Sequence, residues 1–410
     1  MRGPANIGTD MGQRDPRQRL ASARRVVVKV GTNVLMRDDG ALALGRVYGL
    51  VESVAGVIRS GREVLLVSSG AVGLGAQRLG LPGKPKTLVL KQACAAIGQS
   101  RLMAVYDEGF GKLGVTTAQV LLTEGDFADR ARYLNLKATL GRLLSLGTVP
   151  ILNENDAVST LELVTPDAAG KSPVFGDNDK LSALVAAKMD ADLLVLLSDV
   201  DGLYTGNPAR SPSARRVPIV AEVTAEVVSW AEGGGARGRG GMRTKLEAAR
   251  IATTAGACVV VADGRAPQVL DRVLSGEDVG TLFLPHAPIG GRRRWIAWAS
   301  APAATVVVNA GAREALLVRK ASLLPAGVVS VEGEFAPGDV VAIRDEAGQE
   351  LARGRVNFGS GEARQLLGRR SADAARSSRR AALVDRDDLV FTSLPAPGEA
   401  PEPHDDGSSR

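Results

Sequence analysis

Between residues 25 and 284, short apolar segments alternate with longer amphipathic ones, and this alternation constrains the fold more than any other feature. The short segments have the length and β-branched content of buried strands, whereas the longer ones have helical periodicity. Strands are predicted at residues 25–30, 63–67, 116–122, 149–152, 193–197, 258–262 and 281–284, and helices at 43–60, 87–113, 132–146, 179–188 and 242–255. Because continuously apolar strands are buried on both faces, the pattern predicts an α/β domain whose mostly parallel sheet is sandwiched by helices.

The pattern ends in a stretch rich in Pro, Gly and Arg at residues 285–302, which predicts a linker. Short strand candidates with turn residues follow and predict a small β-rich domain at 303–372. These candidates are residues 305–309, 328–332, 339–344 and 350–356. The polar residues 1–24 are predicted to be a disordered extension, and residues 373–410, which end in Pro, Glu, Asp, Gly and Ser, a disordered tail.

Composition narrows the class of protein. Hydrophobic residues make up 45% of the chain and charged residues 23%, the usual balance of a soluble globular protein. Aromatic residues at 3% leave few stacking surfaces for single-stranded nucleic acid. The net charge of +6 suits anionic substrates without requiring nucleic acid. No run of 18 apolar residues occurs and the N-terminus has no apolar signal region, so we expect no membrane association and a cytoplasmic location.

The cysteines and histidines favour neither a metal centre nor histidine catalysis. Cys94 and Cys258 both lie in apolar surroundings, where packing in the core is the expected role. His286 lies in the predicted linker and His404 in the predicted tail. We therefore assign no protein residue as a metal ligand.

Two segments combine small residues, backbone N–H groups and a lysine at the edge of a predicted element. The first, Val28-Lys29-Val30-Gly31-Thr32, ends the first strand, and the second, Gly240-Gly241-Met242-Arg243-Thr244-Lys245, opens a helix. Backbone donors and a helix N-terminus attract phosphate, and each lysine adds a full charge. The simpler alternatives are a solvent-exposed lysine at a strand end and a flexible glycine connector. Two lysines converging on one phosphate chain would indicate phosphoryl transfer.

Two runs dense in carboxylates and amides predict a substrate site beside the phosphate site. Asn153-Glu154-Asn155-Asp156 follows a buried strand, and Gly176-Asp177-Asn178-Asp179 opens a helix. Ordinary Asn/Asp turns and a helix N-cap are the competing explanations. Ligands of parallel sheets bind at the carboxyl ends of strands, where Gly31, Ser69 and Ser198 also fall.

Five segments in order along the chain resemble the glutamate 5-kinases of the amino acid kinase family. They are Val27-Val28-Lys29-Val30-Gly31-Thr32, Val67-Ser68-Ser69-Gly70-Ala71, Ile151-Leu152-Asn153-Glu154-Asn155-Asp156-Ala157-Val158, Phe175-Gly176-Asp177-Asn178-Asp179 and Gly240-Gly241-Met242-Arg243-Thr244-Lys245. The resemblance covers residues 24 to 372 and includes a C-terminal segment similar to the PUA fold. Each motif alone is weak, but five in the family order followed by the appended domain are specific.

The resemblance implies ATP-dependent phosphorylation of the γ-carboxylate of L-glutamate to L-glutamyl 5-phosphate, the first step of proline biosynthesis. It further implies Mg²⁺ as the companion of ATP, proline as a feedback inhibitor, a homo-oligomer and functional coupling to the downstream glutamyl phosphate reductase. No general base is needed, because a carboxylate is already a nucleophile at neutral pH.

The resemblance also implies roles for individual residues. Lys29 and Lys245 would be catalytic and oriented by Asp179, while Ser69, Asp156 and Asn178 would hold glutamate. The implied nucleotide-binding residues are Lys29, Ser198, Asp199, Arg239, Gly240, Gly241, Met242, Arg243, Thr244 and Lys245. The chain departs from the family pattern at Arg239 and Arg243, where small residues are usual, and in a longer segment at 164–173.

Two alternatives remain open from the sequence. One is another amino acid kinase, such as an acetylglutamate or uridylate kinase; Asp156, as the partner of a free ammonium group, favours glutamate. The other is RNA binding through the PUA-like domain at 303–372, with positive charge from Arg292-Arg293-Arg294 and Arg369-Arg370. A role of that domain in regulation or assembly competes with RNA binding.

Overall fold

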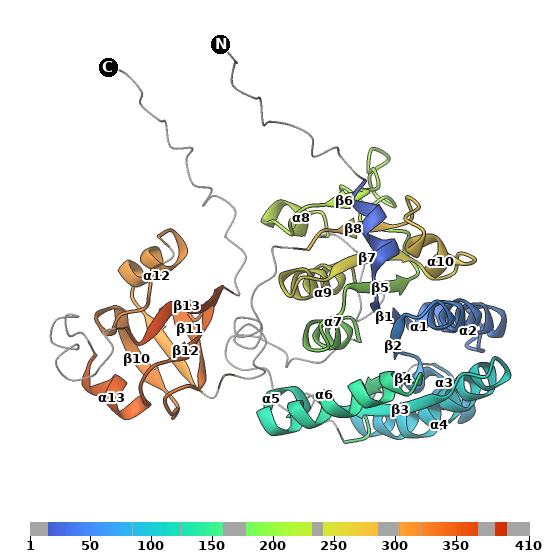
Figure 1. Cartoon of the computed structure of the whole chain (residues 1–410), viewed down its shortest axis with the longest axis horizontal. Helices are drawn as coiled ribbons and strands as arrows, with labels where there is room; N and C mark the ends of the chain where they lie inside the picture. Colours follow the sequence, from blue (N-terminus) through green and yellow to red (C-terminus); the bar gives the residue numbers. More distant parts are fainter. Residues whose placement is uncertain are drawn as a thin grey trace, which may run out of the picture.

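The computed structural model describes residues 15–83, 85–123, 125–158, 178–231, 241–285, 302, 304–319, 321–367 and 382–391. Within these residues the chain forms an eight-stranded sheet and a separate five-stranded sheet, each with its own helices (Figure 1). The predicted linker except for Pro285 and Pro302, the segment at 164–173 and the arginines at 292–294 and 369–370 lie outside the described residues.

The larger sheet has the order β3-β4-β2-β1-β5-β7-β8-β6. Its strands are β1 Arg25–Val30, β2 Glu63–Ser68, β3 Thr117–Leu122, β4 Val149–Glu154, β5 Leu193–Ser198, β6 Ile219–Val220, β7 Cys258–Asp263 and β8 Thr281–Phe283. All neighbouring strands are parallel except β7 and β8, which pair antiparallel. The prediction of a mostly parallel sheet is therefore confirmed.

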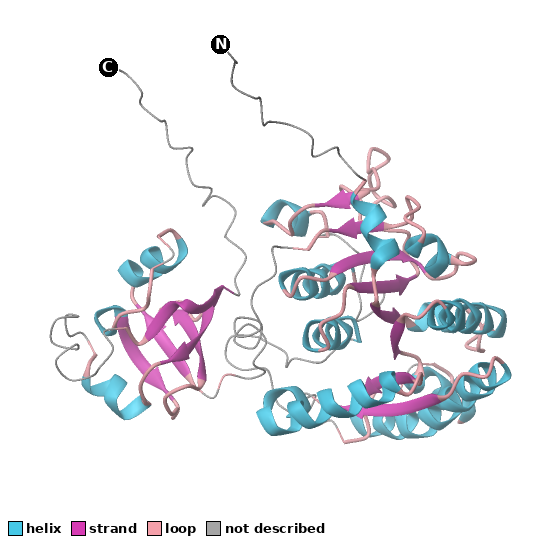
Figure 2. Cartoon of the chain, viewed as in Figure 1, coloured by secondary structure: helices cyan, strands magenta, loops and turns pink. Residues whose placement is uncertain are grey.

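Helices cover both faces of this sheet (Figure 2). They are α1 Thr32–Leu35, α2 Leu44–Arg59, α3 Ala71–Arg78, α4 Leu88–Lys112, α5 Gly125–Ala128, α6 Arg130–Ser145, α7 Asn178–Lys188, α8 Ala225–Ser229, α9 Met242–Thr254 and α10 Val269–Leu274. Successive strand residues enter different cores: Val27 packs with α6, α7 and α9, whereas Val28 packs with α2, α4 and α10. Burial on both faces explains why these strands read as continuously apolar.

Helices α3 and α4 pack with their backbones almost in contact, which the sequence did not predict. A Cβ atom on Gly75 would overlap the carbonyl group of Cys94, and one on Gly98 would overlap that of Ala71. The chain enters α3 through Gly70, whose φ of 105° is a left-handed conformation that glycine adopts without strain. This turn places Ser69 at the carboxyl end of β2.

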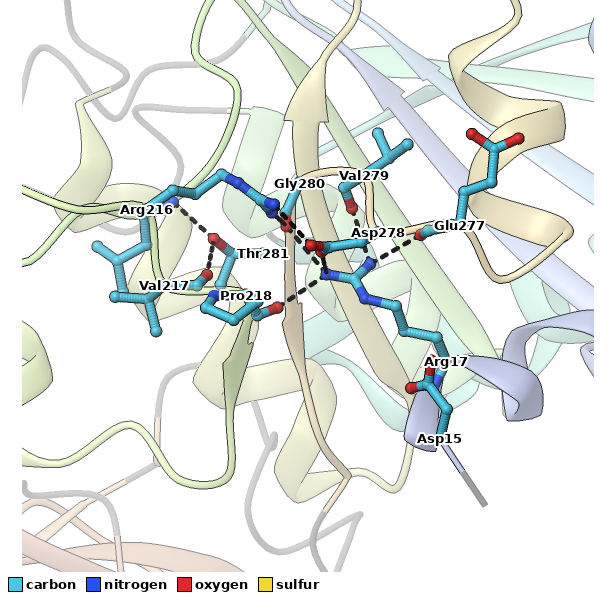
Figure 3. Close-up of polar contacts among 11 residues, drawn as sticks. Asp15, Arg17, Arg216, Val217, Pro218, Glu277, Asp278, Val279, Gly280 and Thr281 are labelled. Carbon is cyan, nitrogen blue, oxygen red and sulfur yellow. Dashed lines mark hydrogen bonds and ion pairs between the residues drawn. The ribbon is translucent and has the colours of Figure 1, made fainter. Parts of the chain in front are cut away.

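The N-terminal segment is ordered from residue 15, so the prediction of disorder over residues 1–24 is wrong for residues 15–24. Pro16–Ser22 forms a 3₁₀ helix, η1, whose Leu20 is buried in the core. Its Arg17 is 2% exposed and donates to the carbonyl oxygens of Glu277, Val279, Pro218 and Gly280 at 2.8–3.2 Å (Figure 3). Four hydrogen bonds from one buried guanidinium thus attach this helix to the edge of the sheet.

The smaller sheet has the order β10-β9-β11-β12-β13. Its elements are β9 Thr305–Val308, α12 Ala310–Leu317, η2 Pro325–Gly327, β10 Val328–Glu332, β11 Val340–Asp345, β12 Glu350–Val356, α13 Ser360–Gln365 and β13 Val384–Phe391. Strand β13 pairs with β12, so the domain extends beyond the predicted limit at residue 372. The predicted disordered tail is accordingly wrong for residues 382–391, whose Leu383 and Val384 are core residues.

Among the described residues, no helix has both the length and the apolar character needed to cross a membrane.

Candidate active site

Two lysines from opposite ends of the larger domain share one buried carboxylate. Lys29 Nζ lies 2.6 Å from Asp179 Oδ1, and Lys245 Nζ lies 3.1 Å from Asp179 Oδ2. All three residues are buried, Asp179 completely. Removing three charges from water is costly unless they compensate one another, which this arrangement does.

Each member of this group occupies the end of a regular element. Lys29 lies in β1, an interior strand of the sheet, with Val67 of β2 and Leu196 of β5 as its neighbours. Asp179 is in the first turn of α7, and Lys245 is in the first turn of α9. Burial penalises the charged form of Asp179, but the ammonium groups of Lys29 and Lys245 outweigh it and lower the pKa of this carboxyl.

The start of α9 adds further polar atoms to the group. Thr244 Oγ1 lies 3.0 Å from Asp179 Oδ2 and 2.9 Å from the carbonyl oxygen of Gly241, which caps the helix. Met242 is half-buried and Arg243 is exposed, whereas Arg239 and Gly240 lie outside the described residues. The helix N-terminus therefore opens beside Lys245, where its free N–H groups favour an anion.

A chain of amides extends from this group towards β2 and β4. Asn178 Nδ2 lies 2.9 Å from both Ser69 Oγ and Asn153 Oδ1, and Asn153 Nδ2 donates to Gln99 Oε1 at 2.9 Å. Asn153 belongs to β4, which extends to Glu154 rather than ending at the predicted residue 152. Because Asn178 precedes Asp179 directly, the amide chain and the lysine pair are joined at the start of α7.

Ser198 and Asp199 form a third group at the carboxyl end of β5. Ser198 Oγ donates to Asp199 Oδ1 at 3.1 Å, and Asn33 Nδ2 donates to Asp199 Oδ2 at 2.8 Å. Burial raises the pKa of Asp199, but the hydrogen bond from Asn33 and further bonds outweigh it, so the net shift is downward. Arg265 donates to the backbone carbonyl of Asp199 at 2.8 Å and fixes the turn.

The structure thus brings most of the predicted site residues to one edge of the sheet. Asp156 lies half-buried in the turn after β4, and Gly176 and Asp177 lie outside the described residues. Gln99 and Asn33 were missed. Asn33 follows the Gly31-Thr32 segment directly and could have been found there, whereas nothing in the local sequence distinguishes Gln99, which α4 brings to Asn153.

No group of three or more His, Cys, Asp or Glu residues able to hold a metal ion occurs in the described part of the chain. The one carboxylate at the centre, Asp179, is engaged by two lysines. This donor set fits a cation held mainly by phosphate oxygens and water, which is the usual coordination of Mg²⁺ beside a nucleotide.

The chain is similar to known proteins over most of its length. The model of the amino acid kinase family matches residues 24–263, and the model of the PUA domain matches residues 304–377. Glutamate 5-kinase from Moorella thermoacetica is 46% identical over 365 residues, covering 88% of this chain and 94% of that protein. Glutamate 5-kinase from Myxococcus xanthus is 48% identical over 362 residues, covering 87% and 92%.

A solved UMP kinase from Bacillus anthracis is 18% identical and covers 65% of this chain and 97% of its own, with a TM-score of 0.44. This similarity is too remote to bear on the reaction. The match to the family model and the identity to these relatives over most of their length decide the assignment. The chain belongs to the amino acid kinase family, in the branch of the glutamate 5-kinases, and carries a PUA domain at its C-terminal end.

Proposed function

We propose that this chain transfers the γ-phosphoryl group of ATP to the γ-carboxylate of L-glutamate, giving L-glutamyl 5-phosphate and ADP as the first step of proline biosynthesis. The observation that carries the proposal is the pair Lys29 and Lys245 held on the two oxygens of Asp179. Sequence identity to glutamate 5-kinases over most of the chain supports the choice of substrate.

The reaction joins two anions, so the protein's task is to position them and to neutralise charge. A carboxylate oxygen of glutamate attacks the γ-phosphorus, and the bond from phosphorus to the β–γ bridging oxygen breaks as ADP leaves. Negative charge spreads over the transferred oxygens in the transition state. Lys29 and Lys245 approach from β1 and from α9, and Asp179 fixes both ammonium groups before the substrates arrive.

Glutamate would lie along the amide chain. The hydroxyl of Ser69 and the amide of Asn178 would hold a substrate carboxylate, and Asp156, in the turn after β4, would accept the α-ammonium group. ATP would lie over the start of α9 and the carboxyl end of β5, at Gly241 to Lys245 and at Ser198 and Asp199. Mg²⁺ bound by phosphate oxygens would neutralise further charge.

The test is consumption of ATP by the purified chain with a panel of acceptors, coupled to trapping the acyl phosphate as a hydroxamate. We expect the product with L-glutamate and none with N-acetyl-L-glutamate or UMP. Asp156→Ala should raise the KM for glutamate strongly and leave the KM for ATP nearly unchanged, because only glutamate carries the ammonium group. An equal loss for both substrates, or faster turnover of N-acetylglutamate, would contradict the assignment.

A further inference from the structure

A cavity of about 280 Å³ lies in the smaller domain, far along the sequence from every residue placed in the active site. Its lining includes Thr305 and Val307 of β9, Ser330 and Glu332 of β10, Arg344 of β11 and Glu346 of the following turn. Cross-strand register explains the grouping: Val307 is the partner of both Ser330 and Arg344, and Thr305 is the partner of Glu332. These side chains occupy the face of the sheet opposite to the core residues Val306, Val308 and Ile343.

Arg344 is incompletely satisfied within this cavity. Its Nε atom is buried and has no hydrogen-bond acceptor among the described residues. A β-bulge between Ile343 and Arg344 turns the strand at this point. Leaving a buried guanidinium donor without a partner is unfavourable, so its presence in a cavity indicates an acceptor supplied by a ligand.

The acidic residues of the cavity differ in their availability. Asp345 accepts a hydrogen bond from the backbone of Gln349 at 2.8 Å and lies 3.6 Å from Arg313 Nε, so it is used within the domain. Glu332 and Glu346 are exposed, and neither side chain has a hydrogen bond or ion pair with another described residue. The cavity therefore offers one available guanidinium and two available carboxylates.

This combination selects for a ligand that carries both signs of charge. A simple anion would pair with Arg344 but be repelled by Glu332 and Glu346. A simple cation would be attracted by these two carboxylates but repelled by Arg344. The hydroxyl groups of Thr305 and Ser330 add neutral donors and acceptors. The volume lies near the lower limit of small-molecule sites, about 300 Å³, so the ligand has few heavy atoms.

We propose that this cavity binds a free α-amino acid as its zwitterion, with the carboxylate on Arg344 and the ammonium group between Glu332 and Glu346. The site is separate from the active site and does not depend on the identity of the phosphorylated substrate. It gives the PUA domain a small-molecule ligand rather than a nucleic acid as its partner.

The experiment is calorimetric titration of the full chain carrying Asp156→Ala, which weakens amino acid binding at the active site. L-alanine is the probe, because it has no γ-carboxylate; propionate lacks its ammonium group and ethylamine lacks its carboxylate. We expect L-alanine to bind at one site per chain and both analogues at least about tenfold more weakly, since each loses a charge-assisted hydrogen bond.

Matched variants locate the site. Arg344→Gln should weaken L-alanine binding at least about tenfold, whereas Arg319→Gln, an exposed arginine of the same domain, should leave it unchanged. Glu332→Gln, at an exposed position, should reduce the preference for L-alanine over propionate. Far-UV circular dichroism of each variant checks that it is folded.

The proposal is overturned if no L-amino acid binds in the Asp156→Ala background, or if L-alanine binds Arg344→Gln and Glu332→Gln as tightly as it binds the Asp156→Ala parent. Equal affinity for L-alanine and propionate would make the cavity a plain anion site. Binding of an RNA hairpin that depends on Arg344, without binding of any amino acid, would replace the small molecule with nucleic acid.

Discussion

Two clusters in the larger domain each place two cations on one carboxylate, yet they differ in every other respect. In the active site, Lys29 and Lys245 share Asp179, which is fully buried. At the edge of the sheet, Arg17 and Arg216 share Asp278, whose side chain is 61% exposed (Figure 3).

The difference lies in the groups that surround the cations. Arg17 donates to four backbone carbonyl oxygens, and Arg216 donates to that of Gly280, so these guanidinium groups join chain segments together. The ammonium groups of Lys29 and Lys245 instead meet on one buried carboxylate beside the starts of α7 and α9, where helix N-termini favour an anion. The arginine cluster is therefore expected to stabilise the fold, and the lysine cluster to stabilise a reacting phosphoryl group.

The largest effect is expected from Asp179→Asn. Removing the buried charge leaves two lysines without their counterion and releases their orientation, so kcat should fall by about 10³-fold, or about 4 kcal/mol. Steady-state kinetics with glutamate and ATP measure this loss. Asp278→Asn is the matched control and should leave kcat unchanged; a comparable loss in both variants would erase the functional distinction between the clusters.

The next effect concerns the lysines individually. Lys29→Ala and Lys245→Ala should each lower kcat by about 10²-fold, the magnitude of one electrostatic contact to a transition state. Lys180→Ala, at a partly exposed lysine of the same helix as Asp179, should retain activity. If both site variants kept normal kcat and only raised KM, the lysines would bind substrate without acting on the transition state.

The arginine cluster should respond in stability instead. Arg17→Ala removes the four hydrogen bonds and the ion pair that attach η1 to the edge of the sheet and should lower the free energy of unfolding by about 2 kcal/mol, with kcat unchanged at temperatures where the protein stays folded. Chemical denaturation measures the change, and exposed Arg19→Ala on the same short helix is the control. A lower kcat of the fully folded Arg17→Ala variant would instead mean that this edge of the sheet contributes to the reaction.

The smallest effect comes from Lys188, a buried lysine with no carboxylate partner among the described residues. It is 6% exposed, its Nζ lies 4.7 Å from the ring centre of Tyr133, and burial lowers its pKa from 10.5 to about 8. Between these two values the unfolded state binds more protons, so stability rises with pH. We expect a gain of about 1 kcal/mol between pH 8 and pH 9.

Lys188→Met should remove this pH dependence, because methionine keeps much of the side-chain volume without a titratable group. Denaturation of both proteins at the two pH values measures the difference. If the free energy of unfolding of Lys188→Met still rose between pH 8 and pH 9 as in the parent protein, another group would titrate in this range.

The alternating apolar pattern sufficed to predict the larger sheet, since continuously apolar strands need cover on both faces, as Val27 and Val28 illustrate. It missed α3, a helix of eight residues that contains two glycines and is held by close packing on α4 through Gly75 and Gly98. It also missed η1 and β13. Their short segments are polar in part, and contacts distant in sequence, from Arg17 and from pairing with β12, hold them in place.

Local sequence by itself determined which residues stand at the ends of the central strands and helices, because periodicity and glycine placement are local properties. Lys29, Asp179 and Lys245 could be singled out in this way. The family resemblance implied that Asp179 orients both lysines, but the contacts themselves, and the support of Asn153 by Gln99, are visible only in the tertiary structure. Such contacts join residues distant in sequence, and their geometry depends on the order of the strands and the packing of helices, which no local pattern encodes.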